Sequence, residues 1–289
     1  MANASSAKTA PSKAARSKSA RSKAARSKTA LVTGASSGIG LAFAKLLAAE
    51  GYDLILVARS EDKLHALKAE LIEQHTIQAF VFSYDLTQPD APQQIFDRVQ
   101  QQNLTVHTLI NNAGFGDYGE FASSDWAKQQ SMISLNVMAL THLSHLFLPT
   151  MIQRDSGGIL NVSSTAAFQP GPLMSVYFAT KAYVLSLTEA IAAEVEGTGV
   201  NVSVLCPGPT QSNFAQAAEM GKVAENDGLS SDKLPSAAEV ASYGYSALQK
   251  GQVVAVHGTA NKVLTFSNRL MPRSLIRKGV KQFMSAIDN

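Results

Sequence analysis

The sequence has little cysteine and no long apolar run. Its single cysteine, Cys206, cannot form an intramolecular disulfide, nor can it supply a thiolate metal site by itself. Because "VSVL" and a proline flank it, we expect Cys206 to be a small core residue. No run approaches the ~18 consecutive apolar residues of a membrane-spanning helix, and residues 1–29 lack the apolar region of a secretory signal. We therefore expect a cytoplasmic protein, with peripheral contact to a membrane as an open alternative.

Residues 1–29 and residues 240–287 contain no acidic side chain. Residues 1–29 carry eight Lys/Arg and residues 240–287 carry seven, whereas residues 30–239 hold 10 basic and 21 acidic side chains. The segment 1–29 is of low complexity and has too few apolar side chains to fold alone. We interpret it as a disordered, solubilising tail or targeting remnant rather than an arm for anionic lipid. Nucleic acid is not an expected partner, because no aromatic residue interleaves the charges.

From Thr29 onward, strand-like and helix-like segments alternate. This rhythm predicts an α/β fold, a doubly wound and mostly parallel sheet of the Rossmann-like type with helices on both faces. We assign residues 30–258 to this domain and residues 259–289 to a C-terminal extension. The expected strands cover 29–34, 53–59, 79–85, 107–114, 157–164, 201–208 and 252–258, and the expected helices cover 38–51, 60–75, 92–102, 124–152 and 176–196.

A glycine-rich turn, "TGASSGIG" at 33–40, separates the first strand from the first helix. Gly34 permits a tight turn, while Gly38 and Gly40 let backbone amides and the helix N-terminus approach a pyrophosphate. The spacing is GxxxGxG rather than the more common GxGxxG. The turn predicts a nucleotide site, which we extend to the intervening residues Ser36, Ser37 and Ile39.

These residues and six later landmarks resemble the short-chain dehydrogenase/reductase family over residues 29–258. The variants "NNAGFG", "NVSSTAAFQPG" and "CPGPTQSNF" resemble its bacterial DltE-like branch. The resemblance implies a homodimer or homotetramer and a small-molecule carbonyl or alcohol substrate. The six landmarks are "DL" at 85–86, "NNAG" at 111–114, "LN" ending at 136, "SS" at 163–164, "YFATK" at 177–181 and "PG" at 207–208.

Charge at the end of the second strand bears on the cofactor. A carboxylate there would bond the ribose 2'-hydroxyl of NAD and repel a 2'-phosphate, but "VARS" places Ala58 at that position with Arg59 directly after it. A guanidinium can pair bidentately with the 2'-phosphate, so the sequence favours NADP(H). The alternative is that Arg59 is an ordinary surface arginine.

The resemblance also implies contacts along the rest of the cofactor. Asp85 would receive the adenine amino group, although from the residues alone it is equally a helix N-cap or turn residue before "LTQP". The other implied contacts are Leu86 beside the adenine ring, Asn112, Ala113 and Gly114 along the adenosine ribose, and Pro207, Gly208 and Thr210 near the nicotinamide.

The pair Tyr177 and Lys181 suits proton transfer. Reducing a carbonyl with hydride requires an acid near its oxygen, and Tyr177 can be that acid. Lys181 follows one helical turn later on the same face, where we expect its positive charge to lower the pKa of the phenol. By the resemblance, Lys181 also bonds the nicotinamide ribose. The alternative is a solvated helix face on which the two residues are neighbours by chance.

Two further polar residues complete the expected catalytic set. Ser164, rather than Ser163, stands thirteen residues before the tyrosine, which is the usual serine position in the family. Its hydroxyl would bond the substrate carbonyl and stabilise developing negative charge. Asn136 would hold a water that links Lys181 to solvent.

Aromatic and sulfur-containing side chains near the motif ends indicate an apolar substrate pocket. They are Phe115, Phe168, Met174, Phe178 and Phe214, and core packing is the alternative for each. Residues 215–235, rich in Ala, Gly and Ser, suit a substrate lid. His142 and His145 are spaced i, i+3 but no third ligand is nearby in the sequence, so no metal is expected.

The C-terminal "KVLTFSNRLMPRSLIRKGVKQFM" is basic and amphipathic, with an expected break at Pro272. We expect it to pack across a dimer or over the pocket, with an anionic membrane surface as the next alternative. For the whole chain, the leading hypothesis is an NADPH-dependent carbonyl reductase. The alternatives are a nucleotide-binding scaffold without turnover and a tethered protein that acts through its basic tail.

Overall fold

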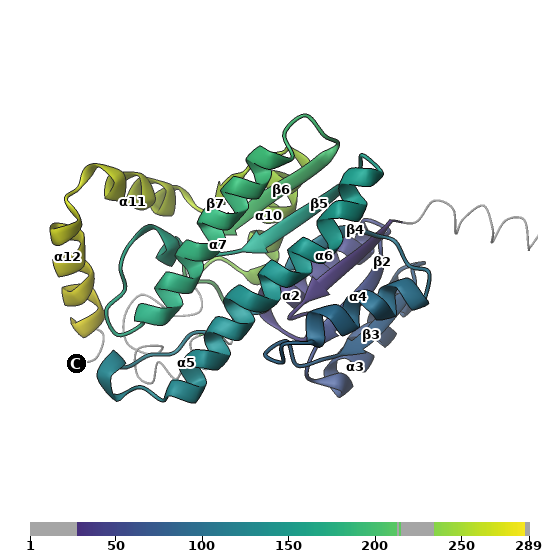
Figure 1. Ribbon diagram of the computed structural model, residues 1–289, viewed down its shortest axis with the longest axis horizontal. Helices are drawn as coiled ribbons and strands as arrows, with labels where there is room; N and C mark the ends of the chain where they lie inside the picture. The colour runs from purple at the N-terminus through teal and green to yellow at the C-terminus, as the bar shows by residue number, and fades with distance from the viewer. Residues whose placement is uncertain (1–27, 213, 215–233, 287–289) are drawn as a thin grey trace, which may run out of the picture.

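The computed structural model describes residues 28–212, 214 and 234–286, and its centre is a seven-stranded sheet (Figure 1). The order is β3-β2-β1-β4-β5-β6-β7 and every pair is parallel, which confirms the doubly wound fold. The strands are β1 (Thr29–Thr33), β2 (Asp53–Ala58), β3 (Ala79–Ser83), β4 (Val106–Asn111), β5 (Gly157–Val162), β6 (Val200–Cys206) and β7 (Val254–Val256).

Helices cover both faces of the sheet because alternate strand residues point to opposite sides. Ala30 and Val32 of β1 pack with α2 (Gly38–Ala49), α3 (Glu61–Gln74) and α10 (Ala237–Gln249). Leu31, between them, packs with α4 (Ala91–Gln101) and α6 (Leu140–Gln153) on the other face. On that second face α7 (Ser175–Glu194) covers β5 and β6.

Helix α10 lies outside the helices that we expected from the sequence. It begins with a capping box, in which the Ser236 hydroxyl accepts from the Glu239 amide and the Glu239 carboxylate accepts from the Ser236 amide. This Ser-x-x-Glu pattern is a helix-start signal that the sequence contains. The sequence instead predicts a substrate lid over residues 215–235, directly before this helix. Residues 215–233 of that lid lie outside the described part of the chain.

The expected helix over 124–152 is observed as three consecutive segments. They are α5 (Trp126–Ile133), a π-helical turn η2 (Ser134–Ala139) and α6. Trp126–Gln153 is long and apolar enough to cross a membrane by length and composition. However, Leu143, Phe147 and Met151 are buried against the sheet, as in the core helix of an α/β domain.

The C-terminal extension forms α11 (Thr259–Leu270) and α12 (Arg273–Ala286), and Pro272 separates them as expected. The two helices lie together at one end of the molecule, at the left of Figure 1. Short 3-10 turns, η1 (Phe121–Ser123) and η3 (Thr165–Phe168), complete the described structure. The predicted N-terminal tail lies outside the described residues except for its last two, Lys28 and Thr29.

Candidate active site

The landmark residues gather at the carboxyl ends of the four central strands. The glycine turn follows β1, Asn112 follows β4, Ser164 follows β5 and Pro207 follows β6. The sheet order changes direction at β1, whose neighbours are β2 and β4. Ligands of doubly wound sheets bind at such a switch point, in the crevice beyond the strand ends.

The glycine turn is a cradle that larger residues would fill. Gly34 has φ 68° and Gly38 has φ 53°, conformations that glycine adopts without strain. A Cβ atom on Gly40 would lie 2.2 Å from the Gly34 carbonyl oxygen. Ser37 is the N-cap of α2 but its side chain makes no capping hydrogen bond, which suits a helix start whose amides serve a phosphate. The turn therefore fits the pyrophosphate of a dinucleotide.

Asn112 and Thr33 lock this turn to the end of β4. The Thr33 hydroxyl accepts from the backbone amides of Asn112 and Ala113 at 2.9 and 3.0 Å, and the Asn112 amide group donates to the Thr33 carbonyl at 3.0 Å. The implied ribose residues Asn112, Ala113 and Gly114 thus lie against the glycine turn.

Arg59 and Asp85 follow β2 and β3 on the same side of the sheet. Arg59 is exposed at the end of β2, and it forms no salt bridge with any residue that the structure describes. Asp85 accepts from the Thr87 amide and hydroxyl at 3.0 and 2.9 Å. Asp85 therefore closes a turn, and Leu86 beside it is buried in the core.

Three catalytic candidates meet at the N-terminal part of α7. The Ser164 hydroxyl lies close enough to Tyr177 to lower the pKa of the phenol. Lys181 donates to the Val162 carbonyl at 2.9 Å, and its Nζ atom lies 5.7 Å from the centre of the Tyr177 ring. Tyr177 and Lys181 are 8% and 6% exposed, so both polar groups lie in a largely dry site. An acid there has little water to compete with a bound carbonyl.

Burial, rather than Lys181, dominates the pKa of Tyr177. Burial raises that pKa and the nearby Ser164 hydroxyl partly offsets the effect, so that the pKa is about 12. Burial also lowers the pKa of Lys181 to about 8. In the protein without cofactor, burial outweighs the lowering that we expect from Lys181, because helical spacing gives the separation of the two side chains but not their desolvation. The effect of Lys181 on Tyr177 stays a prediction. At neutral pH Tyr177 is a protonated phenol.

Ser163 and Ser164 are adjacent in the chain but make different contacts. The Ser163 hydroxyl is buried and donates to the Lys181 carbonyl at 2.7 Å, which anchors α7. Ser164 is partly exposed beside Tyr177 and caps η3 through the Ala166 amide. Only Ser164 is placed to reach a substrate.

Asn136 lies in η2 and is 1% exposed. Its amide group donates to the Phe115 carbonyl at 2.9 Å and to the Thr180 hydroxyl at 3.1 Å, and its oxygen accepts from the Phe115 amide. The Asn136 oxygen and the Lys181 Nζ atom both border Gly114, at 2.9 and 3.4 Å from a Cβ placed on that glycine. The water that we predict Asn136 to hold stays a prediction.

An apolar cluster surrounds the exposed edge of Tyr177. Phe214 lies 5.2 Å from the Tyr177 ring, and Gly116 approaches Met174, Tyr177 and Phe214 so closely that a Cβ would lie within 3.3 Å of each. Phe115 and Phe178 belong to the same cluster. Phe168 does not, because it packs beneath α7 with another cluster.

Two members of this cluster, Tyr118 and Met284, connect it to the C-terminal extension and were not among the residues predicted from the sequence. Met284 of α12 is 5% exposed, and the Tyr118 hydroxyl donates to its carbonyl at 3.3 Å. The C-terminal extension therefore packs against this apolar cluster through α12. No local pattern could link Met284 to Tyr177 across the intervening chain.

The loop after β6 returns to the glycine turn. Pro207 accepts from the Thr165 amide at 2.9 Å, Thr210 donates to the Gly208 carbonyl at 3.0 Å, and a Cβ on Gly38 would lie 3.3 Å from Ser212. This closes the crevice between the predicted phosphate and nicotinamide ends. Within the described residues, no group of three His, Cys, Asp or Glu could hold a metal ion.

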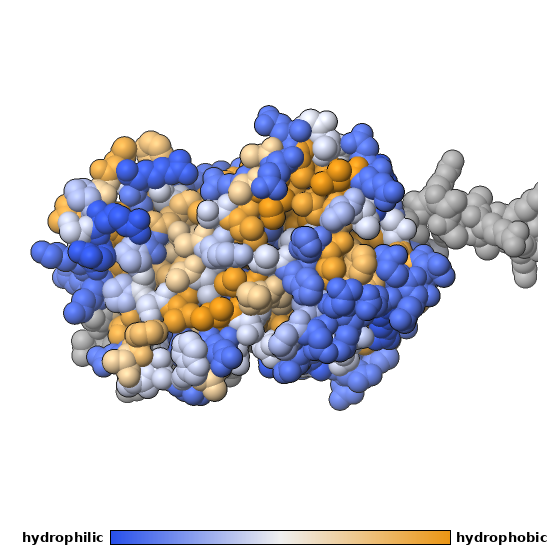
Figure 2. Space-filling model, viewed as in Figure 1, coloured by the Kyte–Doolittle hydropathy of each residue, from blue (hydrophilic) through white to orange (hydrophobic). Residues whose placement is uncertain are grey.

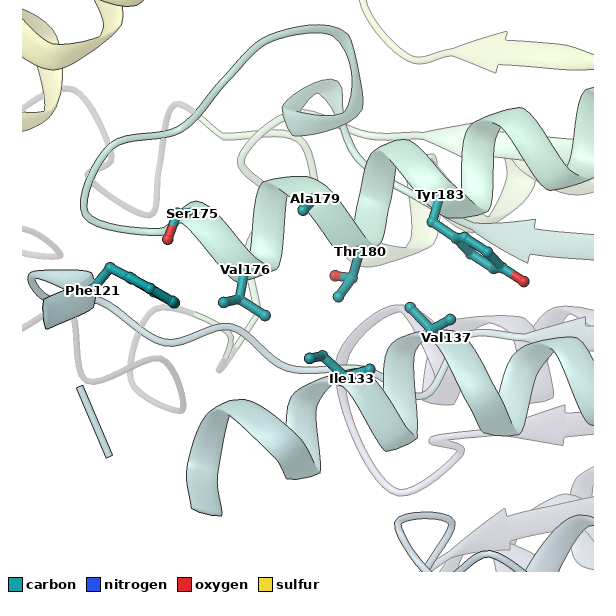
Figure 3. Close-up of a pocket in the computed structure, with 8 residues that line it drawn as sticks. All are labelled: Phe121, Ile133, Val137, Ser175, Val176, Ala179, Thr180 and Tyr183. Atoms are coloured by element: carbon teal, nitrogen blue, oxygen red, sulfur yellow. The ribbon is translucent and has the colours of Figure 1, made fainter. Parts of the chain in front are cut away.

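A second concave surface lies on the outer side of α7. This apolar groove, of about 590 Å³, runs between α7 and the α5–η2 segment, and Figure 3 shows the side chains of these elements facing each other across it. Phe121 and Tyr183, 64% and 40% exposed, border it. It offers a surface for the predicted homodimer or homotetramer, which stays a prediction.

Comparisons with known proteins agree with this geometry. Residues 28–222 match the family model described as short chain dehydrogenase. The chain is 33% identical over 180 residues to a 7beta-hydroxysteroid dehydrogenase of Collinsella aerofaciens, covering 62% of this chain and 68% of that protein. It is 35% identical over 211 residues to sulfoacetaldehyde reductase 2 of Chromohalobacter salexigens, covering 72% and 83%. A solved short-chain dehydrogenase from Sphingobium yanoikuyae in complex with NADPH aligns with TM-score 0.74 and 30% identity, over 84% of this chain and 94% of that one.

Proposed function

The chain belongs to the short-chain dehydrogenase family, and from that premise we propose that it reduces an apolar ketone or aldehyde to an alcohol with NADPH. At the coarser level it is an oxidoreductase of CH–OH or C=O groups that uses a nicotinamide dinucleotide. The observation that carries the proposal is the Ser164–Tyr177–Lys181 arrangement, in which the buried Tyr177 and Lys181 lie beside the partly exposed Ser164 and Tyr177 belongs to the apolar cluster. A scaffold without turnover has no need of a desolvated acid.

The residues of this chain can supply the proton for carbonyl reduction. A bound nicotinamide would supply hydride to the carbonyl carbon, and the carbonyl oxygen would take the phenolic proton of Tyr177 as its negative charge develops. Since burial raises the pKa of Tyr177 to about 12, the phenol starts in the acid form that reduction requires. Ser164 donates to the same oxygen and holds it beside the phenol. Lys181 then stabilises the phenolate until solvent returns the proton.

The preference for NADPH rests on Arg59. It stands at the end of β2, where a carboxylate would select NAD, and it is exposed without an acidic partner among the residues that the structure describes. Its guanidinium is free to pair with a 2'-phosphate. Leu86 and Asp85 lie at the end of the neighbouring strand, which suits the adenine end of the same cofactor.

Activity can be tested by following NADPH oxidation with a panel of apolar ketones and aldehydes. Tyr177→Phe keeps the ring packing against Phe214 but removes the acid, so kcat should fall by at least about 100-fold. Tyr183→Phe is the matched control, because Tyr183 lies two turns later on α7 and faces the outer groove. The proton-donor role is excluded if Tyr177→Phe retains activity. NADPH binding by fluorescence without turnover of any panel member would favour the scaffold instead.

Cofactor choice needs its own variant. Arg59→Asp should raise KM for NADPH by at least about tenfold while leaving or improving KM for NADH, since a carboxylate repels a 2'-phosphate. Lys63→Asp, an equal charge change on the exposed side of α3, is the control. Equal changes in KM for NADPH and NADH would show that Arg59 does not bind the 2'-phosphate.

A further inference from the structure

Helices α11 and α12 expose apolar and cationic side chains together. Val263, Phe266 and Leu270 are 65%, 62% and 74% exposed. Their spacing of three and four residues places them on one side of α11. Thr265, the buried residue of that helix, points to another side. The exposed stripe is therefore not the face by which α11 packs on the domain.

Cations border this stripe. Lys262 and Arg269 of α11 are exposed, and Met271 and Leu275 continue the apolar surface toward α12. Figure 2 shows apolar and hydrophilic side chains intermixed over this end of the molecule. From residue 240 to residue 286 the chain carries seven Lys/Arg and no acid. The two C-terminal helices therefore carry a net positive charge.

A groove of about 770 Å³ lies between α12 and the η3–α7 loop. Four exposed cations of α12 border it, and Phe168, Pro172 and Phe178 form its apolar wall. The cations are Arg273, Arg277, Lys278 and Lys281. Such a groove suits an anionic group attached to an apolar chain.

The two helices are anchored, so these groups keep their positions. Asn268 donates to Gln169 at 2.9 Å, which joins α11 to the η3–α7 loop, and Ile276 and Met284 of α12 are 7% and 5% exposed. A surface already ordered in the free protein loses less conformational entropy on binding than a disordered basic tail.

We propose that α11 and α12 form a docking surface for an anionic phospholipid bilayer. Phosphate groups would meet the cations of α12, and hydrocarbon would receive the Val263–Phe266–Leu270 stripe. A symmetric contact between two copies fits this surface poorly, because it would bring the same Lys and Arg side chains together, and neither α11 nor α12 carries an acid within the residues that the structure describes. The proposal is independent of catalysis, since none of these residues belongs to the proposed chemistry.

Vesicle flotation of the full-length chain tests the proposal. Binding is expected to vesicles of about one-third phosphatidylglycerol in phosphatidylcholine, and not to phosphatidylcholine alone. The triple change Val263→Ser, Phe266→Ser and Leu270→Ser should lower the partition coefficient at least about tenfold, because it removes the apolar contact. These side chains are exposed, so the variant should keep its circular dichroism spectrum and its NADPH binding.

Charge is tested by a second variant and a matched control. Replacing the four α12 cations with Gln should lower binding at least about tenfold. The control replaces the four lysines 45, 63, 68 and 250 with Gln, which removes the same charge from α2, α3 and the end of α10 and should change binding less than about threefold.

Several results would overturn the proposal. The proposal is excluded if the wild-type protein does not float with anionic vesicles. It is also excluded if the α11 and α12 variants bind vesicles as the wild type does, because binding would then depend on another segment, such as residues 1–29. If the triple α11 variant changes from oligomer to monomer in sedimentation velocity while vesicle binding is retained, the stripe contacts a second copy. The Tyr177→Phe variant should bind vesicles as the wild type does. Vesicle binding and carbonyl reduction can therefore be tested, and can fail, independently of each other.

Discussion

Replacing Lys181 with Met should change the free energy of unfolding, relative to the wild type, more favourably at neutral pH than at alkaline pH. Lys181 is 6% exposed, and its Nζ atom donates to the Val162 carbonyl. Burial lowers the pKa of Lys181 from 10.5 to about 8. The folded state therefore binds fewer protons than the unfolded state between these two values, so wild-type stability rises with pH across that range.

The magnitude follows from the two pKa values. At pH 7 the lowered pKa costs the wild type ~3 kcal/mol of unfolding free energy relative to a neutral side chain, and at pH 9.5 it costs ~1 kcal/mol. Met is of similar length but carries no charge, so the variant avoids this cost at both pH values. It also leaves the Val162 carbonyl without its donor, which costs ~1–3 kcal/mol at either pH. The variant minus wild-type difference should therefore become ~2 kcal/mol less favourable between pH 7 and pH 9.5.

Urea unfolding of both proteins, followed by circular dichroism at the two pH values, measures this difference. Groups other than Lys181 titrate in both proteins, so their contributions cancel in the comparison. Carbonyl reduction by the Met variant should be lost even where its stability is retained. A difference in unfolding free energy that is constant with pH, or that grows in favour of Met toward pH 9.5, would refute the assignment of a desolvated ammonium.

Three further changes test other parts of the structure. Gly40→Ala places a Cβ 2.2 Å from the Gly34 carbonyl oxygen, so the turn must move and the Kd for NADPH, measured by fluorescence titration, should rise at least about tenfold. Asn161→Leu leaves the buried Asn111 and Thr188 side chains without a shared partner and should cost ~2–4 kcal/mol in urea unfolding. Ser236→Ala removes the α10 capping box and should cost ~1 kcal/mol, with an unchanged m value.

Features that depend on the spacing of neighbouring residues could be predicted from the sequence. The glycine turn, the strand ends and the Tyr177–Lys181 helical turn follow from rules that involve only a few neighbouring residues. The resemblance added Asn136 and the choice of Ser164, which local rules alone leave open. The assignment to the DltE-like branch stays a prediction.

Properties that depend on distant packing were not predictable. The direction of the Tyr177 pKa depends on how deeply the ring is buried, and periodicity carries no such information. Met284 reaches the apolar cluster only because α12 folds back over it, and Phe168 leaves that cluster because η3 turns it beneath α7. Helix α10 differs from these features, because its Ser236–Glu239 capping box can be recognised in the sequence and the helix could have been predicted from it.

The bonds between Thr33 and the end of β4 have a consequence for how the chain folds. The Thr33 hydroxyl joins residues that are 80 positions apart, and β1 acquires its second neighbour only when β4 docks. During synthesis, β1 can pair with β2 early, while the backbone N–H and C=O groups on its other edge stay unpaired until β4 has left the ribosome. An uncovered edge of "TALVT" can pair with another nascent chain. Refolding yield should therefore fall as protein concentration rises, and the cofactor cradle should form only after β4 has docked on β1.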